Sequence, residues 1–209
     1  MNKTLTALHP AGNGARETIA LETPYTVSVT IEGSAPILFH RWDNEAIEEK
    51  AKAKKNSKAK KEDNIESYIY RNEAGEICIP GEYLRQSIIL AAKYKADPRS
   101  PRKSASDLFK AGVVSLTELA SLGVKDWDYL DRRRVMIQKQ GITRTRPALQ
   151  KGWRASFDIQ VLTPEYIDSA LLHEVIVQAG RLVALGDFRP TFGRYFITKY
   201  EVQQGGATQ

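Results

Sequence analysis

One stretch of this chain carries too much charge to be buried, and it constrains how the remainder can fold. Between Arg132 and Arg154 there is no Asp or Glu, and eight side chains are cationic. They are Arg132, Arg133, Arg134, Lys139, Arg144, Arg146, Lys151 and Arg154. Like charges at this density repel one another, and a polyanion such as a nucleic acid would neutralise them. A solvated hairpin with ordinary surface cations is the alternative.

The residues on either side of this stretch have the pattern of strands. Val135 and Ile137 are β-branched, and apolar residues alternate with polar ones from Trp153 to Phe157. Glycine and proline interrupt the pattern in between. We therefore expect two strands joined by a long, basic, irregular excursion over about residues 138–152, with Val135, Ile137, Trp153 and Phe157 as its anchor.

The composition excludes several classes of protein. The net charge of +6 favours an anionic partner. A single cysteine, Cys78, excludes a disulfide framework, and its apolar neighbours predict a buried thiol. Three scattered histidines do not make a zinc site, and neither a Walker A sequence nor a Gly-x-Ser-x-Gly elbow is present, so we expect no cofactor. Without a long apolar run or a signal core, we expect a cytoplasmic protein that does not contact a membrane.

The first third of the chain predicts one strand between two segments without a core pattern. Residues 1–23 lack periodicity and predict a flexible arm. Tyr25 to Glu32 alternates cleanly and predicts a strand with one buried face. In the following loop, Arg41 and Trp42 place a ring beside a cation, which suits stacking on bases; a cap on the core is the alternative for Trp42. Residues 45–63 carry seven lysines and predict a mobile insertion.

The rest of the chain predicts two long helices and further strands. Two short strands flank a turn at residues 72–75, and Pro80-Gly81 then begins a helix. Residues 97–103 predict a loop, and residues 105–112 and 115–122 predict short helices or a small subdomain. Thr163 followed by Pro164 predicts the start of a second long helix that ends at Gly186. A final strand over Tyr195–Val202 and a polar tail at residues 204–209 complete the chain.

The long elements follow the order strand, helix, strand, strand, helix, strand. This order predicts an α+β fold with a ferredoxin-like or RRM-like core, an antiparallel sheet covered on one face by two helices. We expect a single domain over residues 24–203, with insertions at about 45–63, 97–128 and 138–152.

Two motifs resemble those of the RAMP superfamily, RRM-like proteins that include backbone subunits of CRISPR effector filaments. In the run from Glu76 to Tyr94, the residues Ile79, Pro80, Gly81, Leu84 and Arg85 match the family's turn from strand to first helix. Glu82 and Tyr83 replace its usual serine pair. The run from Ala184 to Val202, with Gly186 and Gly193, resembles its glycine-rich turn before a closing strand.

The resemblance implies that the basic excursion is a β-hairpin "thumb" that interrupts the core and contacts a bound strand. It fits both a CRISPR-type backbone subunit and a stand-alone, phage-type single-strand-binding protein that works in the host cytoplasm. Some members of the family cleave RNA with an aspartate after the first strand, and Asp43 occupies that place here. Metal-assisted cleavage normally needs clustered carboxylates, so we expect no enzymatic activity.

We therefore predict a sequence-independent binder of single-stranded DNA or RNA that assembles side by side into a homo-oligomer or filament. A CRISPR-type subunit with RNA endonuclease activity is one alternative, and an assembly module that binds no nucleic acid is another. RNA and DNA are not distinguished. The residues predicted to contact nucleic acid are Arg41, Trp42, Arg85, Lys139, Arg144, Arg146, Lys151, Arg154, Arg189, Phe192 and Arg194. Arg85 is predicted to act beside free N–H groups at a helix start, and Arg189 and Arg194 beside the glycines.

Overall fold

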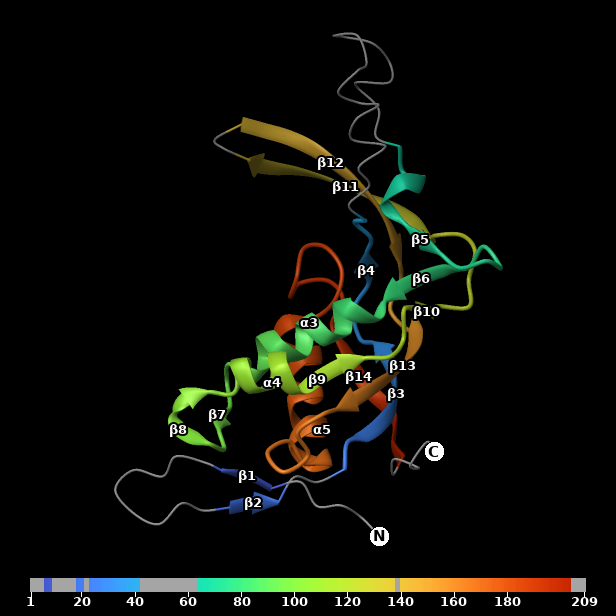
Figure 1. The fold of residues 1–209 in the computed structure, drawn as a ribbon. Coiled ribbons are helices and arrows are strands. Elements are labelled where there is room, and N and C mark those ends of the chain that lie inside the picture. Colours follow the sequence, from blue (N-terminus) through green and yellow to red (C-terminus); the bar gives the residue numbers. More distant parts are fainter. Residues whose placement is uncertain (1–5, 9–17, 21–22, 42–63, 138–139, 204–209) are drawn as a thin grey trace, which may run out of the picture.

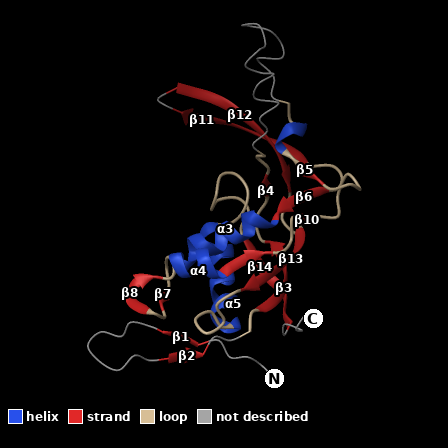
Figure 2. Ribbon diagram, viewed as in Figure 1, coloured by secondary structure: helices blue, strands red, loops and turns tan. Residues whose placement is uncertain are grey.

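The computed structural model describes residues 6–8, 18–20, 23–41, 64–137 and 140–203 of the chain (Figure 1). In this part of the chain, three α-helices accompany several antiparallel sheets, so the structure belongs to the α+β class (Figure 2). The α+β part of the predicted fold class is therefore confirmed.

A four-stranded antiparallel sheet carries the core, with its strands in the order β14-β3-β13-β9. Their bounds are Tyr25–Gly33 for β3, Val113–Ser115 for β9, Arg154–Val161 for β13 and Tyr195–Gln203 for β14. Along β3, Val27, Val29 and Ile31 are buried, whereas the residues between them are partly exposed. The two-residue period of the sequence therefore gives the sheet one apolar face.

Helices α3 (Gly81–Ala92) and α5 (Ser169–Gln178) cover that apolar face. Leu84 and Ile88 of α3 join Leu172 and Val175 of α5 in the same buried cluster as Val29. A shorter helix, α4 (Ser106–Gly112), packs against α3 and leads into β9. In chain order, the sheet and the two longer helices run β3, α3, β9, β13, α5, β14.

The opposite face of the sheet is polar, and its side chains bond to one another. Ser28 donates to Asp158, at 2.5 Å, and Arg154 donates to Glu32, at 2.7 Å from Nε to Oε2. Phe196 is a large apolar side chain exposed on β14, where its register partner is Glu32. With carboxylates among its side chains, this face is not a basic stacking platform.

Two three-stranded sheets adjoin the core. In one, β6 (Ile77–Pro80) lies between β5 (Tyr70–Arg71) and β10 (Leu119–Ser121). In the other, β12 (Gln140–Leu149) lies between β11 (Tyr129–Ile137) and β4 (Ile37–Leu38). Figure 1 shows that the β11–β12 hairpin extends away from the helices at one end of the molecule.

The remaining elements are short. A 3-10 helix, η1 (Glu66–Tyr68), precedes β5, and two small hairpins are formed by β1 (Thr6–Leu8) with β2 (Thr18–Ala20) and by β7 (Ala96–Asp97) with β8 (Ser100–Ser104). Figure 1 places the β7–β8 hairpin far from the β11–β12 hairpin. The predicted arm over residues 1–23 thus contains a paired strand segment, and the predicted loop at 97–103 is largely a hairpin.

Two further expectations differ from the structure. The excursion over residues 138–152 is not irregular, because β12 occupies most of it and pairs with β11 through nine residue pairs from Tyr129↔Ala148 to Ile137↔Gln140. Pro147 fits within β12 because its carbonyl accepts from Phe39 N–H at 3.0 Å, and proline lacks only a donor. Residues 115–122 contain the end of β9, a short loop and strand β10 instead of a helix, because Ala120 pairs with Ile79 of β6.

The second long helix begins later than predicted. Thr163 only closes a turn, since its carbonyl accepts from Tyr166 and Ile167 N–H groups. Asp168 is the N-cap, and its side chain accepts from Leu171 N–H at 2.7 Å. After α5 the chain widens into a π-helix, η2 (Ala179–Val183), so the helical segment ends before Gly186. At Gly180 a side chain would lie 2.2 Å from the Tyr195 carbonyl, so glycine permits the close approach of η2 and β14.

Among the described residues, no helix combines the length and the apolar character that crossing a bilayer requires.

Candidate nucleic-acid interface

The base of the β11–β12 hairpin has one face on which cations and a carboxylate alternate. In the antiparallel register, Asp131 lies opposite Arg146 and Arg133 lies opposite Arg144. Directly opposed residues of an antiparallel pair share a face, so these four side chains lie on the same side of the hairpin. Arg132 and Arg134 point to the other side, where they are exposed.

The segment from Ala184 to Arg194, here called the glycine loop, is fixed to β4 and to the turn before it. Asp187 N–H donates to the Leu38 carbonyl at 2.9 Å, and Gly193 N–H donates to the Pro36 carbonyl at 2.7 Å. Gly193 has φ +71°, and a side chain there would lie 1.7 Å from the Leu185 carbonyl. Only glycine satisfies both conditions, so the tight path of the loop depends on this residue.

Asp187 joins the glycine loop to the hairpin. Its Oδ2 accepts from Arg146 Nε at 3.1 Å and lies 3.7 Å from Arg144 Nη1. Its Oδ1 accepts from the Phe188 N–H at 3.0 Å. The Arg146 side chain is only 4% exposed, so its charge depends on this carboxylate for compensation.

Aromatic rings complete the cluster. The Arg133 guanidinium lies 4.8 Å from the ring centre of Phe188 and 4.6 Å from that of Phe192, and it is paired with Asp131. The Arg146 guanidinium lies 4.1 Å from the ring centre of Tyr68. Both arrangements are within cation–π distance. We call Asp131, Arg133, Arg144, Arg146, Tyr68, Asp187, Phe188 and Phe192 the hairpin-base cluster.

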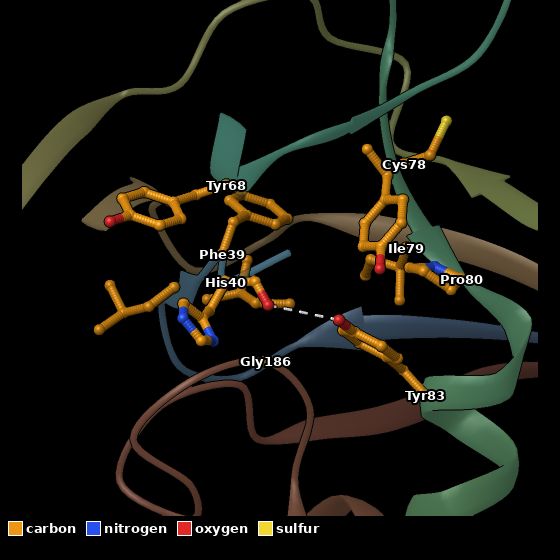
Figure 3. Close-up of a pocket in the computed structure, with 11 residues that line it drawn as sticks. Phe39, His40, Tyr68, Cys78, Ile79, Pro80, Tyr83 and Gly186 are labelled. Carbon is orange, nitrogen blue, oxygen red and sulfur yellow. Dashed lines mark hydrogen bonds between the residues drawn. The ribbon is translucent and has the colours of Figure 1, made fainter. Parts of the chain in front are cut away.

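Tyr68 of the cluster also lines a small cavity with other aromatic rings, here called the aromatic floor (Figure 3). Phe39, His40, Tyr68 and Tyr83 surround a cavity of about 10 Å³, and the Tyr83 hydroxyl donates to the His40 carbonyl at 3.4 Å. A water molecule needs about 10–15 Å³, so this cavity does not accept a nucleobase. Burial, and then the charge of nearby Arg146, lower the pKa of His40 below its ordinary value.

Exposed cations surround the cluster. Arg189 and Arg194 lie in the glycine loop, and Arg41 lies near η1, with its guanidinium 5.2 Å from the Tyr70 ring centre. Arg132 and Arg134 lie on the far side of the hairpin. Inside the cluster, three guanidinium groups face two carboxylates, so the site and its rim are positively charged as a whole.

The structure brings three of the predicted contact residues together in this cluster: Arg144, Arg146 and Phe192. Arg189 and Arg194 belong to the glycine loop, and Arg41 follows His40 of the aromatic floor. Since Arg146 is buried and paired with Asp187, its side chain holds the hairpin to the glycine loop. That Arg146 contacts nucleic acid directly stays a prediction.

Three predicted residues lie elsewhere. Arg85 holds α3 to α4 and β9, because its guanidinium donates to the Val113 and Lys110 carbonyls at 2.7 Å each and to Glu82. The N–H of Gly81, at the start of that helix, donates to the Glu118 carbonyl at 2.9 Å, so it is not available for phosphate. Lys151 lies in the turn between β12 and β13, and Arg154 lies on the polar face of the sheet. Trp42, Asp43 and Lys139 lie outside the described residues.

Sequence reasoning missed the carboxylates of the site. Asp131 stands one residue before the acid-free span, and Asp187 is 41 positions from Arg146. Asp131 could have been found, because residues two apart on a strand share a face with each other, as Asp131 and Arg133 do. No pattern of neighbouring residues in the sequence indicates that Asp187 pairs with Arg146. None indicates that Tyr68 belongs to the site either.

Within the described part of the chain, no group of three or more His, Cys, Asp or Glu side chains is arranged to hold a metal ion. Asp43 is outside that part, so the predicted absence of nuclease activity stays a prediction.

No protein-family model matches the sequence, and no curated protein matches it. Among solved structures, a chain of the Csm3–Csm4 subcomplex of the type III-A CRISPR-Cas interference complex is similar at a TM-score of 0.39 and 14% sequence identity. The similarity covers 88% of this chain and 80% of that chain.

Proposed function

We propose that this protein binds single-stranded nucleic acid, without sequence specificity, along the hairpin-base cluster and its rim. The observation that carries the proposal is the convergence of guanidinium groups and aromatic rings where the β11–β12 hairpin meets the glycine loop. Cations that follow a phosphate backbone, combined with rings on which bases stack, are the usual components of a single-strand site.

The topology supports a ferredoxin-like interpretation of the core. The chain order β3, α3, β9, β13, α5, β14 with the spatial order β14-β3-β13-β9 has two helices on one face of an antiparallel sheet. In this interpretation the β11–β12 hairpin is an insertion between the two middle strands, the place expected for a thumb. The ligand lies at the hairpin and not on the open sheet face, because the cations Arg154 and Lys199 of that face are each paired with a carboxylate.

Two layers of the site have different roles in the proposal. The exposed side chains of Arg41, Arg189 and Arg194 supply phosphate contacts, which are independent of sequence. The buried Arg146 and its partner Asp187 hold the hairpin against the glycine loop. The proposal includes the assembly of copies of the protein side by side along one strand. Whether that strand is DNA or RNA is a separate question for the binding experiments.

Salt titration of fluorescence anisotropy tests the proposal. If these three exposed arginines neutralise phosphates, the affinity for a labelled 20-nucleotide oligo(dT) or oligo(U) falls with salt at a logarithmic slope of about −2. Weak, salt-insensitive binding by both oligonucleotides would refute it.

A matched pair of double variants locates the site. Arg189→Gln with Arg194→Gln should weaken binding about tenfold and reduce the slope by about one and a half units. Arg102→Gln with Lys103→Gln removes two exposed cations from β8, far from the β11–β12 hairpin, and should leave affinity within about twofold. Equal losses in the two proteins would show that net charge alone, and not this site, governs binding.

A further inference from the structure

A groove lies on the side of the glycine loop next to helix α3. Its walls come from the end of α3 and the residues just after it, with Leu90, Lys93 and Tyr94, from Leu182 of η2, and from Phe188 and Arg189 of the glycine loop. Its volume is about 460 Å³, within the range of about 300–1,000 Å³ found for small-molecule sites. We call it the loop groove.

The loop groove gathers large apolar side chains that would ordinarily be covered. Leu90 is 44% exposed, Tyr94 is 54% exposed and Leu182 is 49% exposed. Such side chains occur singly on most surfaces, but here three of them line one hollow together with Phe188. Their surface is suited to the flat, apolar faces of a ring.

The charged groups of the groove favour an anion. Lys93 Nζ lies 4.7 Å from the ring centre of Tyr94, and Arg189 is exposed at the other wall. Asp187 also lines the groove, but its carboxylate is engaged by Arg146. A ring platform with a cation at each side matches a nucleotide, whose base stacks and whose phosphate needs a counter-charge.

Phe188 connects this groove to the hairpin-base cluster. Its ring is contacted by Arg133 from the hairpin side, and the same residue lines the groove. Phe188 has φ +54° and Ala184, at the start of the loop, has φ +67°. Non-glycine residues adopt this region at a cost, and such strain persists where the surrounding structure fixes it, often at ligand sites.

We propose that the loop groove holds one nucleotide of a bound single strand, with its base against Tyr94 and Phe188 and its phosphate between Lys93 and Arg189. This inference rests on the proposed function, which it extends by one defined subsite. The strand leaves the hairpin-base cluster at Phe188 and enters the groove there. The lining presents mainly apolar and cationic side chains to the base, so the subsite accepts any nucleobase.

The full-length protein with a 20-nucleotide oligo(dU) that carries 5-iodouracil provides the test. Irradiation should cross-link the oligonucleotide to Tyr94 or Phe188, as mapped by mass spectrometry. Tyr94→Ala should weaken binding about tenfold, the effect of losing one base–ring stack, and Tyr94→Phe should bind like the wild type. Phe196→Ala is the control, because this ring is similarly exposed, at 48%, but lies on the polar face of the sheet; it should bind like the wild type.

Three results would overturn part or all of this reasoning, and they are distinguishable. If the wild type binds no oligonucleotide, the proposed function is wrong. If the wild type binds, but Tyr94→Ala binds equally well and cross-links map only to the hairpin, the groove subsite is wrong and the proposed function stands. If Tyr94→Ala changes only the sedimentation of the free protein, the groove is a protein–protein contact and the subsite is again wrong.

Discussion

Replacing Asp187 by Asn should lower stability and raise affinity for nucleic acid, two effects of opposite sign from one side chain. The carboxylate accepts hydrogen bonds from two groups, from the buried Arg146 guanidinium at Oδ2 and from the Phe188 N–H at Oδ1. Asparagine has one acceptor oxygen and no charge, so it cannot serve both groups.

The loss of stability can be worked from these contacts. A hydrogen bond to a charged group contributes about 1.5–3 kcal/mol, and the partly exposed Arg144, at 3.7 Å, adds about 0.2–1 kcal/mol. Arg146 keeps the Tyr68 ring and the Thr145 carbonyl as partners. We therefore expect a loss of about 2–3 kcal/mol, below the roughly 3–5 kcal/mol typical of an abolished buried pair.

The gain in affinity follows from the charge. Removing one negative charge at about 8 Å from a phosphate, at an effective dielectric constant near that of water, is worth about 0.5 kcal/mol before screening and more where solvent is excluded. Binding should therefore tighten about two- to fivefold, and the salt slope should steepen by about 0.7 as one further cation becomes available.

Urea unfolding and oligonucleotide anisotropy on the same preparations measure both effects. Asp97→Asn is the matched control: Asp97 is 5% exposed and pairs with Arg99 in the distant β7–β8 hairpin. It should lose comparable stability with no change in affinity. If Asp187→Asn weakens binding while remaining folded at the assay temperature, the carboxylate positions the arginines for the ligand instead of competing with it. Unchanged stability would contradict the buried-pair argument.

Three further predictions concern the fold. Gly193→Ala should cost about 3 kcal/mol or more in urea unfolding, because its side chain would meet a loop carbonyl, whereas Gly75→Ala, with φ +77° and open space around it, should cost about 1 kcal/mol. Burial raises the pKa of Tyr195 well above its ordinary value, so the unfolded chain ionises first and stability should fall as the pH rises above about 10; Tyr195→Phe should reduce that fall. Asp168→Ala should lose about 1 kcal/mol, seen as a lower Tm in calorimetry, because it removes the N-cap of α5.

The local patterns of the sequence predicted local structure well. The alternation from Tyr25 to Glu32 located β3, and Pro80-Gly81 located the start of α3, because a strand period and a helix start each depend on adjacent residues. The Thr163-Pro164 signal was of the same kind and failed, since a stronger cap, Asp168, lies five positions later. Residues 115–122 carry no period, and their strand exists only because β6 lies beside it.

The site was harder to predict than the fold because its pairs are distant in sequence. The basic stretch and the glycine loop were both identified, but nothing in either one indicated that Asp187 binds Arg146. If the Asp187–Arg146 pair is not known, Arg146 is easily taken for a residue that contacts the ligand. Once the pair is known, its side chain is seen to hold the hairpin against the glycine loop. The exposed Arg189 and the ring of Phe192 could be identified from composition alone, because cations beside aromatics in a glycine-rich turn already favour a surface site.

The position of β12 determines which parts of the hairpin can bend. Its inner residues, Ala148 and Leu149, pair with β4 while Arg146 and Pro147 are buried, and β4 in turn carries the carbonyl that anchors the glycine loop. A pivot at the root of the hairpin would break the β4 ladder, so bending is restricted to the stretch beyond Arg144. The root of the hairpin, β4 and the glycine loop are therefore joined into one hydrogen-bonded unit.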